Sequence, residues 1–467
     1  MINQFFWPDT APTGRFLADV ACAAEAQQND AHSLEMIAIC GAVPYGAPAN
    51  GNVNGRKKGG ENKGAGNTYG AHPGDASPDS DDAAYIPRPP VRILRPSATR
   101  FSRDAVGRIL SYGSFLTGAL GTAFRVGRPD IVVTLTTPPL TSVFGRMLKL
   151  TRGCRHFIWE MDVYPDIAVD LGTLKRHSLL TCLIGALADW SRRNADGIIV
   201  LGEEMKARLI ARDIPVHKIH VAENWADGTE ITPLPFPEGP PATPLILHYS
   251  GNFGLAHDFD TISSVIQLYA NDPRFQFVFC GGGTHRQKLE ALCKPQCTHG
   301  QGIANVLFRP YASRADLGRS LAEGHLGLVT QLPQTCGSLV PSKTYGILAA
   351  GRPLLYIGPR EATPARLIER FRCGWHVNPG DTGALGDLME KLAAHRHLVF
   401  EAGARARQAF EQNYDRPMGA ARIVKILGLI PNLQEAPALA AAGVVRAGPV
   451  RQPAGSRAVA APTAQGL

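Results

Sequence analysis

Lys343 has the clearest chemical surroundings of any residue in this sequence. It lies in residues 337–353, GSLVPSKTYGILAAGRP, where a loop gives way to an apolar helix that a glycine ends. Pro341 suits the first turn of that helix because its missing N–H costs nothing there. Ser338 and Ser342 have hydroxyls that accept hydrogen bonds from free helix-start amides. A helix start beside a lysine attracts anions, so the run predicts a diphosphate site, with an ordinary well-capped helix as the alternative.

A glycine turn after an apolar strand supplies a second set of candidate residues. The apolar run 245–249 is followed directly by Gly251, Asn252 and Gly254, with His257 just beyond. Glycines let a ligand approach the backbone closely. The turn is therefore expected to line the same site, unless its glycines serve only to make the chain turn.

A third segment repeats this arrangement later in the chain. The apolar run 275–280 is followed by three glycines, of which Gly282 is the central one, and then by Arg286. The glycines permit close approach of a ligand, and the Arg286 guanidinium is long enough to reach a phosphate. A lone glycine run is a weak motif, so its value depends on where the fold places it.

Asp162 is the candidate acid, base or substrate-orienting residue of the N-terminal half. It follows the apolar run 155–159, and parallel sheets bind ligands beyond the carboxyl ends of their strands. Glu160 and Asp166 are alternatives, and a helix cap or a loop carboxylate would explain Asp162 equally well. The sequence shows no carboxylate pair that would serve a glycoside hydrolase.

The order of these segments resembles that of GT-B glycosyltransferases of the family-4 type, most closely bacterial enzymes that build polysaccharides from nucleotide sugars. Such enzymes open the C-terminal domain with a strand, a glycine turn and a helix, and their phosphate-binding helix ends in AAG-x-P, as at 349–353. The resemblance covers roughly residues 1–45 and 85–428. Further matching segments are the first loop, 6–15; a strand resembling PDVV…TSPP, 128–139; an E-x-D-x-x-P-D segment, 159–166; and two strands before the hinge, 196–203 and 221–227.

The resemblance implies an α/β protein of two facing Rossmann-like domains with parallel sheets. It also implies transfer of a hexosyl group, with retained configuration, from a nucleotide sugar on the C-terminal domain to an acceptor on the N-terminal domain. Asp162 and Lys343 are the predicted catalytic residues, and Lys343 would stabilise negative charge on the leaving diphosphate. The predicted donor-binding residues are Gly14, Gly251, Asn252, Gly254, His257, Gly282, Arg286, Ser338, Val340, Ser342 and Tyr345.

The sequence departs from the wider family at two places. Many members carry two glutamates spaced E-x7-E, where this chain has Ser338 and Gly346. Many also carry an arginine and a lysine after the first glycine turn, where this chain has Asn252 and the pair His257-Asp258. The contacts to ribose and sugar therefore cannot be transferred from the family.

Apolar runs alternate with helical periods along two stretches of chain, which favours parallel sheets covered on both faces. The expected N-terminal domain, 1–227, is interrupted at 44–84 by a polar, glycine-rich insertion that buries too little apolar surface to order itself. A proline-rich linker, 228–244, precedes the C-terminal domain, 245–415. The end of the chain consists of a closing helix, 416–430, and a tail rich in Ala, Gly and Pro, 431–467, which is expected to be disordered.

Positive charge is concentrated in one part of the chain. The net charge is +8, and the segment from Arg88 to Arg155 contains twelve basic residues but only two acids, Asp104 and Asp130. Apolar helices interleave with these cations, so the segment fits an anionic membrane surface or a lipid-linked diphosphate acceptor. A solvated basic face, or arginines paired with acids elsewhere, is the alternative. Nucleic acid is not an expected partner, because few aromatics and no nucleic-acid motif accompany the cations.

No apolar run is long enough to span a bilayer, and the N-terminus lacks the basic region of a signal peptide. The nine cysteines are scattered, and the pair Cys293 and Cys297 has no second pair to complete a zinc site, so neither a metal nor a cofactor is expected. We therefore expect a cytoplasmic protein, peripheral on the inner face of the plasma membrane, that acts on a lipid-linked or saccharide acceptor.

Two other functions fit the same architecture. A nucleotide-sugar epimerase would need no acceptor, and the basic segment would then have no purpose. An inactive sugar-nucleotide-binding relative would explain the absent glutamates. An NAD-dependent dehydrogenase is disfavoured, because no G-x-G-x-x-G follows an N-terminal strand.

Overall fold

The computed structural model describes residues 1–4, 6, 12–28, 34–41, 89–99, 105–238, 243–294 and 302–429. By its contacts, the chain up to residue 430 forms one compact unit. The insertion expected at 44–84 and the tail expected from residue 431 lie outside the described residues.

The N-terminal half is built on parallel strands. Strands β3, β4, β5 and β6 form a sheet in that order, and β1 pairs with β2 beside it. Ile2 bridges Ile39 of β1 on one side and Thr134 of β3 on the other, so the first residues of the chain join the two sheets. The strands are β1 (Ile37–Ile39), β2 (Arg92–Leu94), β3 (Ile131–Leu135), β4 (Arg155–Trp159), β5 (Gly197–Val200) and β6 (Ile219–Val221). The helices are α1 (Pro12–Glu25), α3 (Ala105–Arg125), α4 (Thr141–Arg152), α5 (Asp166–Asp170), α6 (Leu179–Asn194) and α7 (Glu203–Ile210), with a 3-10 turn, η1 (Val216–Lys218).

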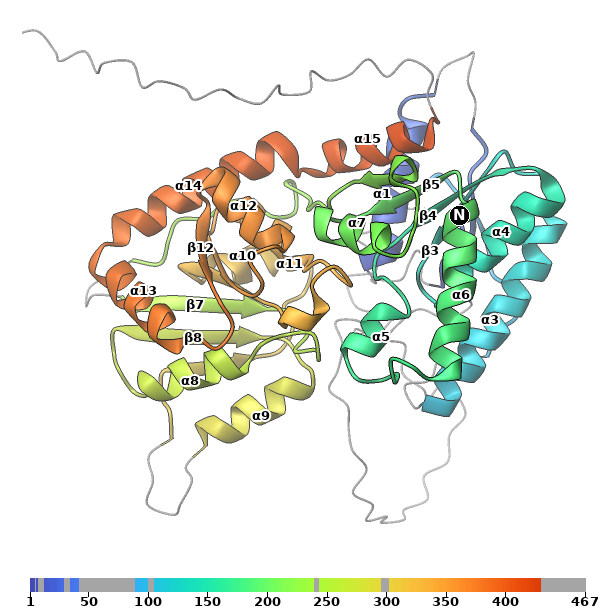
Figure 1. Cartoon of the computed structure of the whole chain (residues 1–467). Helices are drawn as coiled ribbons and strands as arrows, with labels where there is room; N and C mark the ends of the chain where they lie inside the picture. The colour runs from blue at the N-terminus through green and yellow to red at the C-terminus, as the bar shows by residue number, and fades with distance from the viewer. Residues whose placement is uncertain are drawn as a thin grey trace, which may run out of the picture. The chain divides into compact units, whose positions relative to one another are not determined.

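The C-terminal half contains a six-stranded parallel sheet in the order β12-β11-β10-β7-β8-β9. Its strands are β7 (Leu245–Ser250), β8 (Phe275–Cys280), β9 (Val306–Arg309), β10 (Leu326–Thr330), β11 (Leu354–Ile357) and β12 (Gly374–Val377). Figure 1 shows its helices on both sides of the sheet. They are α8 (Asp260–Leu268), α9 (Thr284–Cys293), α10 (Leu317–Ala322), α11 (Lys343–Ala349), α12 (Thr363–Phe371), α13 (Thr382–Ala394), α14 (Arg396–Asn413) and α15 (Arg416–Leu427), with a 3-10 turn, η2 (Pro333–Thr335).

Strand order explains where a ligand belongs on this sheet. Strand β7 comes first in the sequence, β8 and β9 continue to one side, and β10 to β12 continue to the other. All of these strands are parallel, but the order in which they are added across the sheet reverses between β7 and β10. Open α/β sheets bind ligands beyond the carboxyl ends of the strands at such a point. The turn after β7 contains Gly251, and the segment after β10 leads to Lys343.

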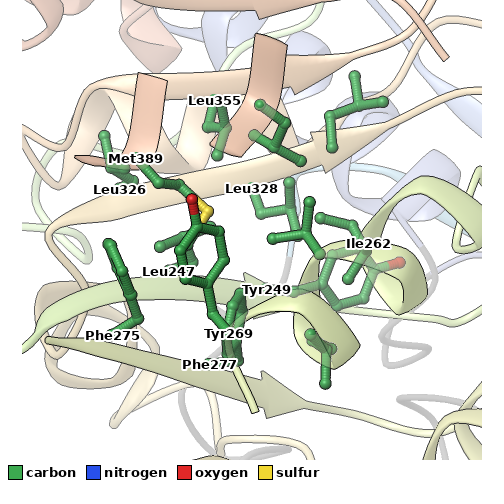
Figure 2. Close-up of a cluster of buried hydrophobic side chains, with 14 of the residues drawn as sticks. Leu247, Tyr249, Ile262, Tyr269, Phe275, Phe277, Leu326, Leu328, Leu355 and Met389 are labelled. Carbon is green, nitrogen blue, oxygen red and sulfur yellow. The ribbon is translucent and has the colours of Figure 1, made fainter. Parts of the chain in front are cut away.

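Both faces of this sheet are covered, which is why its strands read as continuous apolar runs. Figure 2 shows one side of the core, where Tyr249, Phe277 and Leu328 from three neighbouring strands pack with Ile262 and Met389 from two helices. All five side chains are buried. Each contributes about 1.5–3 kcal/mol by leaving water, so the site rests on a rigid support.

Arg352 fixes the proline-rich linker to the C-terminal half. It is almost fully buried, and its Nη2 donates to the carbonyls of Leu234, Pro235 and Ala322 at 3.1, 2.9 and 2.8 Å. Its guanidinium lies 4.1 Å from the centre of the Phe236 ring. Burial lowers the Arg352 pKa to about 10, which leaves it charged at neutral pH. A motif arginine thus holds the segment that precedes the sheet.

Helix α15 contacts α1 and so returns to the N-terminal half, as expected of the closing helix. The contact is close at Gly419, where an added Cβ would lie 2.4 Å from the Trp225 ring. The Trp225 indole donates to the Asp19 carboxylate of α1 at 2.8 Å, and its ring lies 4.7 Å from the centre of Phe16. The predicted α/β architecture of two Rossmann-like domains is confirmed, while the exact domain boundaries stay a prediction.

A single added methyl group tests this close packing. We expect Gly419→Ala to lower the free energy of unfolding by about 1–3 kcal/mol, because the methyl overlaps a ring that other contacts hold in place. The measurement is denaturant unfolding followed by tryptophan fluorescence. The matched control is Gly121→Ala on α3, where no atom lies within 4 Å of the new methyl and helix propensity should add about 0.5–1 kcal/mol. Equal stability of the two variants would show that α15 does not press on Trp225.

Candidate functional site

Lys343 lies at the carboxyl ends of β7 and β10, where three neutral acceptors surround its ammonium group. Its Nζ donates to the Tyr249 hydroxyl, to the Asn252 carbonyl at 3.3 Å and to His257 Nε2 at 3.2 Å. It also lies 3.8 Å from the centre of the Tyr249 ring. Burial lowers the Lys343 pKa well below its usual value, and no carboxylate offsets that effect. Lys343 is therefore a desolvated lysine whose positive charge, when it is protonated, has no counter-charge within the described residues.

The protonation of His257 follows from its neighbours. Its Nδ1 lies 2.7 Å from the Thr330 carbonyl, which only accepts hydrogen bonds, so Nδ1 carries the proton. Nε2 is then free to accept from Lys343. Burial, reinforced by the Lys343 charge, holds the His257 pKa well below its usual value, so the ring stays neutral. His257 therefore positions the ammonium group without adding a second charge.

Neighbouring atoms leave no room for a side chain at Gly251 or Gly281 in the two turns of the site. Gly251 has φ +136°, and a Cβ there would lie 2.9 Å from Lys343 Cε. Gly281 has φ +130°, and a Cβ there would lie 2.0 Å from the Gly251 carbonyl oxygen. A Cβ added at Gly254 would lie 3.1 Å from Asn252 Nδ2. The turns after β7 and β8 thus lie against each other and against Lys343.

The start of α11 differs from the prediction in two respects. The helix begins at Lys343, with Ser342 as the preceding residue in helical conformation and no side-chain hydrogen bond capping it. Pro341 therefore lies before the helix and not in its first turn, and its carbonyl accepts a hydrogen bond from Thr344 Oγ1 at 2.9 Å. The predicted capping by Ser342 and Ser338 is therefore wrong. The predicted end of the helix at Gly351, φ +65°, is confirmed.

Ser338 bonds across to the N-terminal half instead. Its hydroxyl donates to the Asp170 carboxylate, and Arg208 Nη1 donates to the same hydroxyl at 2.5 Å. The Ser338 carbonyl accepts from the Val163 amide at 2.8 Å. The position that the wider family fills with a glutamate is thus used here to connect two parts of the chain.

The remaining predicted donor-binding residues lie in different surroundings. Tyr345 is fully buried, with its ring 5.2 Å from that of Tyr414, and Val340 is also buried. Gly14 lies buried in the first turn of α1. These positions are part of the framework around the site, and a direct role for them in binding a donor stays a prediction.

The second glycine turn holds Arg286 close to the backbone. Its guanidinium donates to the carbonyls of Gly281 and, at 2.5 Å, Arg309, and it pairs with Glu290 at 2.6 Å. The Gly282 carbonyl accepts from the Phe253 amide at 2.8 Å and from the Tyr311 hydroxyl at 3.2 Å. Arg286 would have to leave these partners to reach a phosphate, so its role in binding also stays a prediction.

Asp162 follows β4 and lies beside the segment that leads to Lys343. It forms an antiparallel bridge with Leu339, four residues before the lysine. Its side chain is half-buried and makes no hydrogen bond to the rest of the described chain. Burial, with a smaller effect from the Glu160 charge, raises the Asp162 pKa to about 6. A carboxyl group that exchanges its proton near neutral pH is suited to acid–base chemistry or to binding a hydroxyl.

The two alternative carboxylates are already ion-paired. Glu160 is buried and accepts from Arg192 Nε at 2.7 Å. Asp166 accepts from Arg212 at 3.1 Å and lies 3.5 Å from Arg208. Their charges are therefore balanced by arginines, which leaves Asp162 as the free carboxylate of the three.

These pairs belong to a continuous chain of charges that runs from β4 to the C-terminal half. Asp189 joins Arg192 and Arg212 at 3.1 and 2.7 Å. Arg208 then pairs with Asp170 at 2.6 Å, and its Nη2 donates to the Cys336 carbonyl at 3.0 Å. A separate contact is made by Glu204, also on α7, which accepts from the Thr363 amide at 2.8 Å. Helix α7 thus binds the C-terminal half at two points.

Sequence reasoning missed several residues that shape this site. Tyr249, Thr330, Arg208 and Asp170 were not singled out, although the first two hold Lys343 and His257 and the last two hold Ser338. Only Tyr249 gave a usable signal, since it is a hydroxyl-bearing residue at the end of an apolar strand next to a glycine turn. Among the described residues, no group of three or more His, Cys, Asp or Glu side chains could hold a metal ion.

Comparison with known proteins relates the chain to enzymes of one activity. No family model matches it. It is 28% identical over 329 residues to the probable glycosyltransferase WbjE of Pseudomonas aeruginosa, which covers 68% of this chain and 80% of that protein. It is 22% identical over 303 residues to the putative colanic acid biosynthesis glycosyl transferase WcaI of Escherichia coli K12, covering 62% and 72% of the two chains.

Solved structures show the fold. Sucrose-phosphate synthase from Thermosynechococcus elongatus superposes with a TM-score of 0.62 at 14% identity, covering 89% of this chain and 92% of that one. Anabaena HepE in complex with UDP and glucose superposes with a TM-score of 0.61 at 11% identity, covering 91% and 98%. The architecture is therefore GT-B.

The free carboxylate gives a pH-dependent prediction. Folding raises the Asp162 pKa from 3.8 to about 6, so its contribution to stability is present below pH 4 and is lost as the pH rises through 6. We expect Asp162→Asn to increase the free energy of unfolding by about 1–3 kcal/mol at pH 7.5 and to have no effect near pH 4. Denaturant titrations at several pH values measure this. Asp166→Asn is the control, and it should destabilise because it leaves Arg212 without one partner; a loss of stability at Asp162 as well would show a structural role for both.

Proposed function

Since this chain is a GT-B glycosyltransferase related to bacterial enzymes of polysaccharide biosynthesis, we propose that it transfers a hexosyl group from a UDP sugar to a lipid-linked or saccharide acceptor. We further propose that it does so with retained configuration, on the cytoplasmic side of the plasma membrane and in contact with that membrane. The product would be part of a cell-surface polysaccharide.

One observation carries the proposal. The Lys343 amino group is held by a hydroxyl, a carbonyl and a neutral imidazole, and no carboxylate among the described residues balances its charge. A desolvated cation of this kind binds an anion strongly, because the anion supplies the counter-charge that the protein omits. Its position beyond the carboxyl ends of β7 and β10 is where a Rossmann-like sheet binds a nucleotide. A diphosphate is therefore the fitting ligand.

The chemistry follows from this placement. The bond between the sugar C1 and the diphosphate oxygen breaks, a bond from C1 to the acceptor oxygen forms, and the acceptor proton passes to the departing phosphate. Negative charge grows on that phosphate in the transition state, and Lys343 lowers the barrier by being in place beforehand. Since the phosphate can take the proton, retention of configuration requires no enzymic nucleophile.

Asp162 would serve the acceptor. It belongs to the N-terminal half, its carboxylate has no partner among the described residues, and its backbone pairs with the segment leading to Lys343. A carboxylate near half-ionisation can accept a hydrogen bond from an acceptor hydroxyl and align it with C1. Glu160 and Asp166 would not, because arginines occupy them.

The choice of donor and product rests on the relatives. HepE is seen with UDP-glucose and with UDP, and WcaI is described as acting in colanic acid biosynthesis. No helix in the described part of the chain is both long and apolar enough to cross a membrane. A lipid-linked acceptor would consequently have to be met at the membrane surface.

The decisive experiment is a screen of UDP and GDP sugars with a membrane extract that supplies acceptors. Transfer of labelled sugar from a UDP donor into lipid or polymer is the expected result. Conversion of the donor to its epimer without an acceptor would replace the proposal by an epimerase, and tight nucleotide binding without turnover would indicate an inactive relative.

Lys343 should be the side chain most needed for turnover. We expect Lys343→Ala to lower kcat/KM by a factor that corresponds to about 2–4 kcal/mol, because one charge-assisted phosphate contact is lost in the transition state. Initial rates with saturating acceptor measure it, and Lys391→Ala, an exposed lysine on α13, is the control. Activity within a few-fold of wild type would place the diphosphate elsewhere.

Asp162 should separate binding from catalysis. We expect Asp162→Asn to lower kcat by about 10²-fold or more while calorimetry finds the affinity for UDP within a few-fold of wild type, since a residue on the acceptor side does not touch the nucleotide. An unchanged kcat would make Asp162 structural.

A further inference from the structure

The start of α6 exposes its apolar side chains to solvent. Leu179, Leu180 and Leu183 are 91%, 57% and 58% exposed, and Trp190 further along is 38% exposed. Large apolar side chains gathered at one place on a folded protein usually mark an interaction site.

The helix is well ordered there, so the exposure is not a frayed end. The Ser178 hydroxyl caps it by accepting from the Thr181 amide at 3.2 Å. The side facing the protein is formed by small or polar residues, with Thr181, Gly185 and Ala188 buried. An ordinary surface helix has the opposite arrangement, with apolar residues inward. The leucines in the first turns of α6 therefore face solvent and not the protein core.

Positive charge precedes these leucines. Lys175 and Arg176 are exposed, and no acidic residue occurs from 171 to 188. Neither Lys175 nor Arg176 forms an ion pair within the part of the chain that the structure describes. Leucines beside unpaired cations match a bilayer interface, where apolar side chains enter the acyl boundary and cations meet lipid phosphates.

Many cations of the basic segment 88–155, by contrast, have partners within the protein. Lys149 pairs with Asp196 at 2.6 Å and Arg92 with Glu35 at 3.7 Å. Arg152 donates to the Phe124 carbonyl at 3.0 Å, and Arg155 donates to the Leu427 carbonyl at 3.3 Å. These four cations therefore have partners within the protein, and two of them pair with acids, as the alternative for this segment supposed.

The topology places the exposed leucines at the same edge of the N-terminal sheet as Asp162. Helix α6 connects the carboxyl end of β4 to the amino end of β5, and these strands are parallel. Its first turn therefore lies at the edge of the sheet beyond which Asp162 is found. Pro165, which precedes the short helix α5, lies beside Gly185 of α6, where an added Cβ would be 3.7 Å from its ring.

We propose that residues 175–183 dock on an anionic phospholipid bilayer, with Leu179, Leu180 and Leu183 in the interface and Lys175 and Arg176 at lipid phosphates. The inference rests on the proposed function, because a lipid-linked acceptor would lie in such a bilayer. Docking can nevertheless be measured without turnover. The orientation presents the acceptor side of the protein to the membrane.

Vesicle flotation tests the proposal on the full chain. Wild type should float with vesicles of phosphatidylglycerol and phosphatidylcholine at low salt, less at high salt, and hardly with phosphatidylcholine alone. The variant Leu179→Asp/Leu180→Asp should lose at least tenfold in partition coefficient. It should still fold, because aspartate is favoured in the first turn of a helix. Lys175→Glu/Arg176→Glu should lose binding to the anionic vesicles to a similar degree.

Matched controls separate docking from general surface effects. Leu268→Asp changes a leucine of 61% exposure on α8, and Lys391→Glu reverses an exposed lysine on α13; both should float like wild type. UDP affinity by calorimetry should stay unchanged in every variant, so a failed docking test would leave the proposed transferase reaction standing. Flotation of the α6 double variants at the wild-type level would overturn the proposal. Sedimentation gives a second test. If the wild type is a dimer and the leucine variant is a monomer, the exposed leucines bind a second copy of the chain, and the proposal is wrong.

Discussion

A buried lysine without a carboxylate partner in the part of the chain that the structure describes is the constraint around which the C-terminal half is arranged. Lys343 is desolvated, and its hydrogen bonds go to Tyr249, Asn252 and His257. Each of these needs its own support: the Tyr249 hydroxyl donates to the Asn252 carbonyl at 2.6 Å, and the Thr330 carbonyl fixes the imidazole. Gly251 must lack a side chain to make room for the lysine. The apolar core in Figure 2 holds these groups in place, and the missing counter-charge is left for a ligand to supply.

The N-terminal half uses charge in the opposite way. Around β4, arginines and carboxylates are matched in a network that begins at Glu160 and ends at Ser338. Removing one member would leave a partner poorly compensated in a partly dry environment, which is costly. The network therefore fixes the segment 336–339 relative to β4, and Asp162 is excluded from it. One half thus keeps a cation unpaired and the other keeps a carboxylate unpaired, on two segments whose backbones meet at Leu339.

Much of this arrangement could be predicted from the sequence, because the signals were local. Apolar runs, glycine turns and the AAG-x-P ending predicted the parallel sheets and the place of Lys343, and the strand before Asp162 predicted its position. The predicted capping of α11 was wrong, since the Ser338 hydroxyl bonds to Asp170 and Arg208, which are distant in sequence and which a local pattern does not contain. Arg208 and Asp170 were missed for the same reason: an ion pair 38 residues apart in sequence and a hydrogen bond 130 residues apart leave no periodicity. The exposure of the α6 leucines could not be predicted, because apolar composition alone does not say which side of a helix faces solvent.

The return of α15 to α1 has a consequence for biosynthesis. Phe16, Trp159 and Trp225 form an aromatic cluster under α1, and Gly419 of α15 packs against it. At about 5–20 residues per second, a ribosome needs roughly 10–40 seconds to add the approximately 200 residues between Trp225 and α15. For that time the nascent N-terminal half has all of its own strands but not the helix that covers this cluster. A chaperone would meet an apolar face that is still uncovered, and α15, from near the end of the described chain, then completes the packing of the N-terminal half.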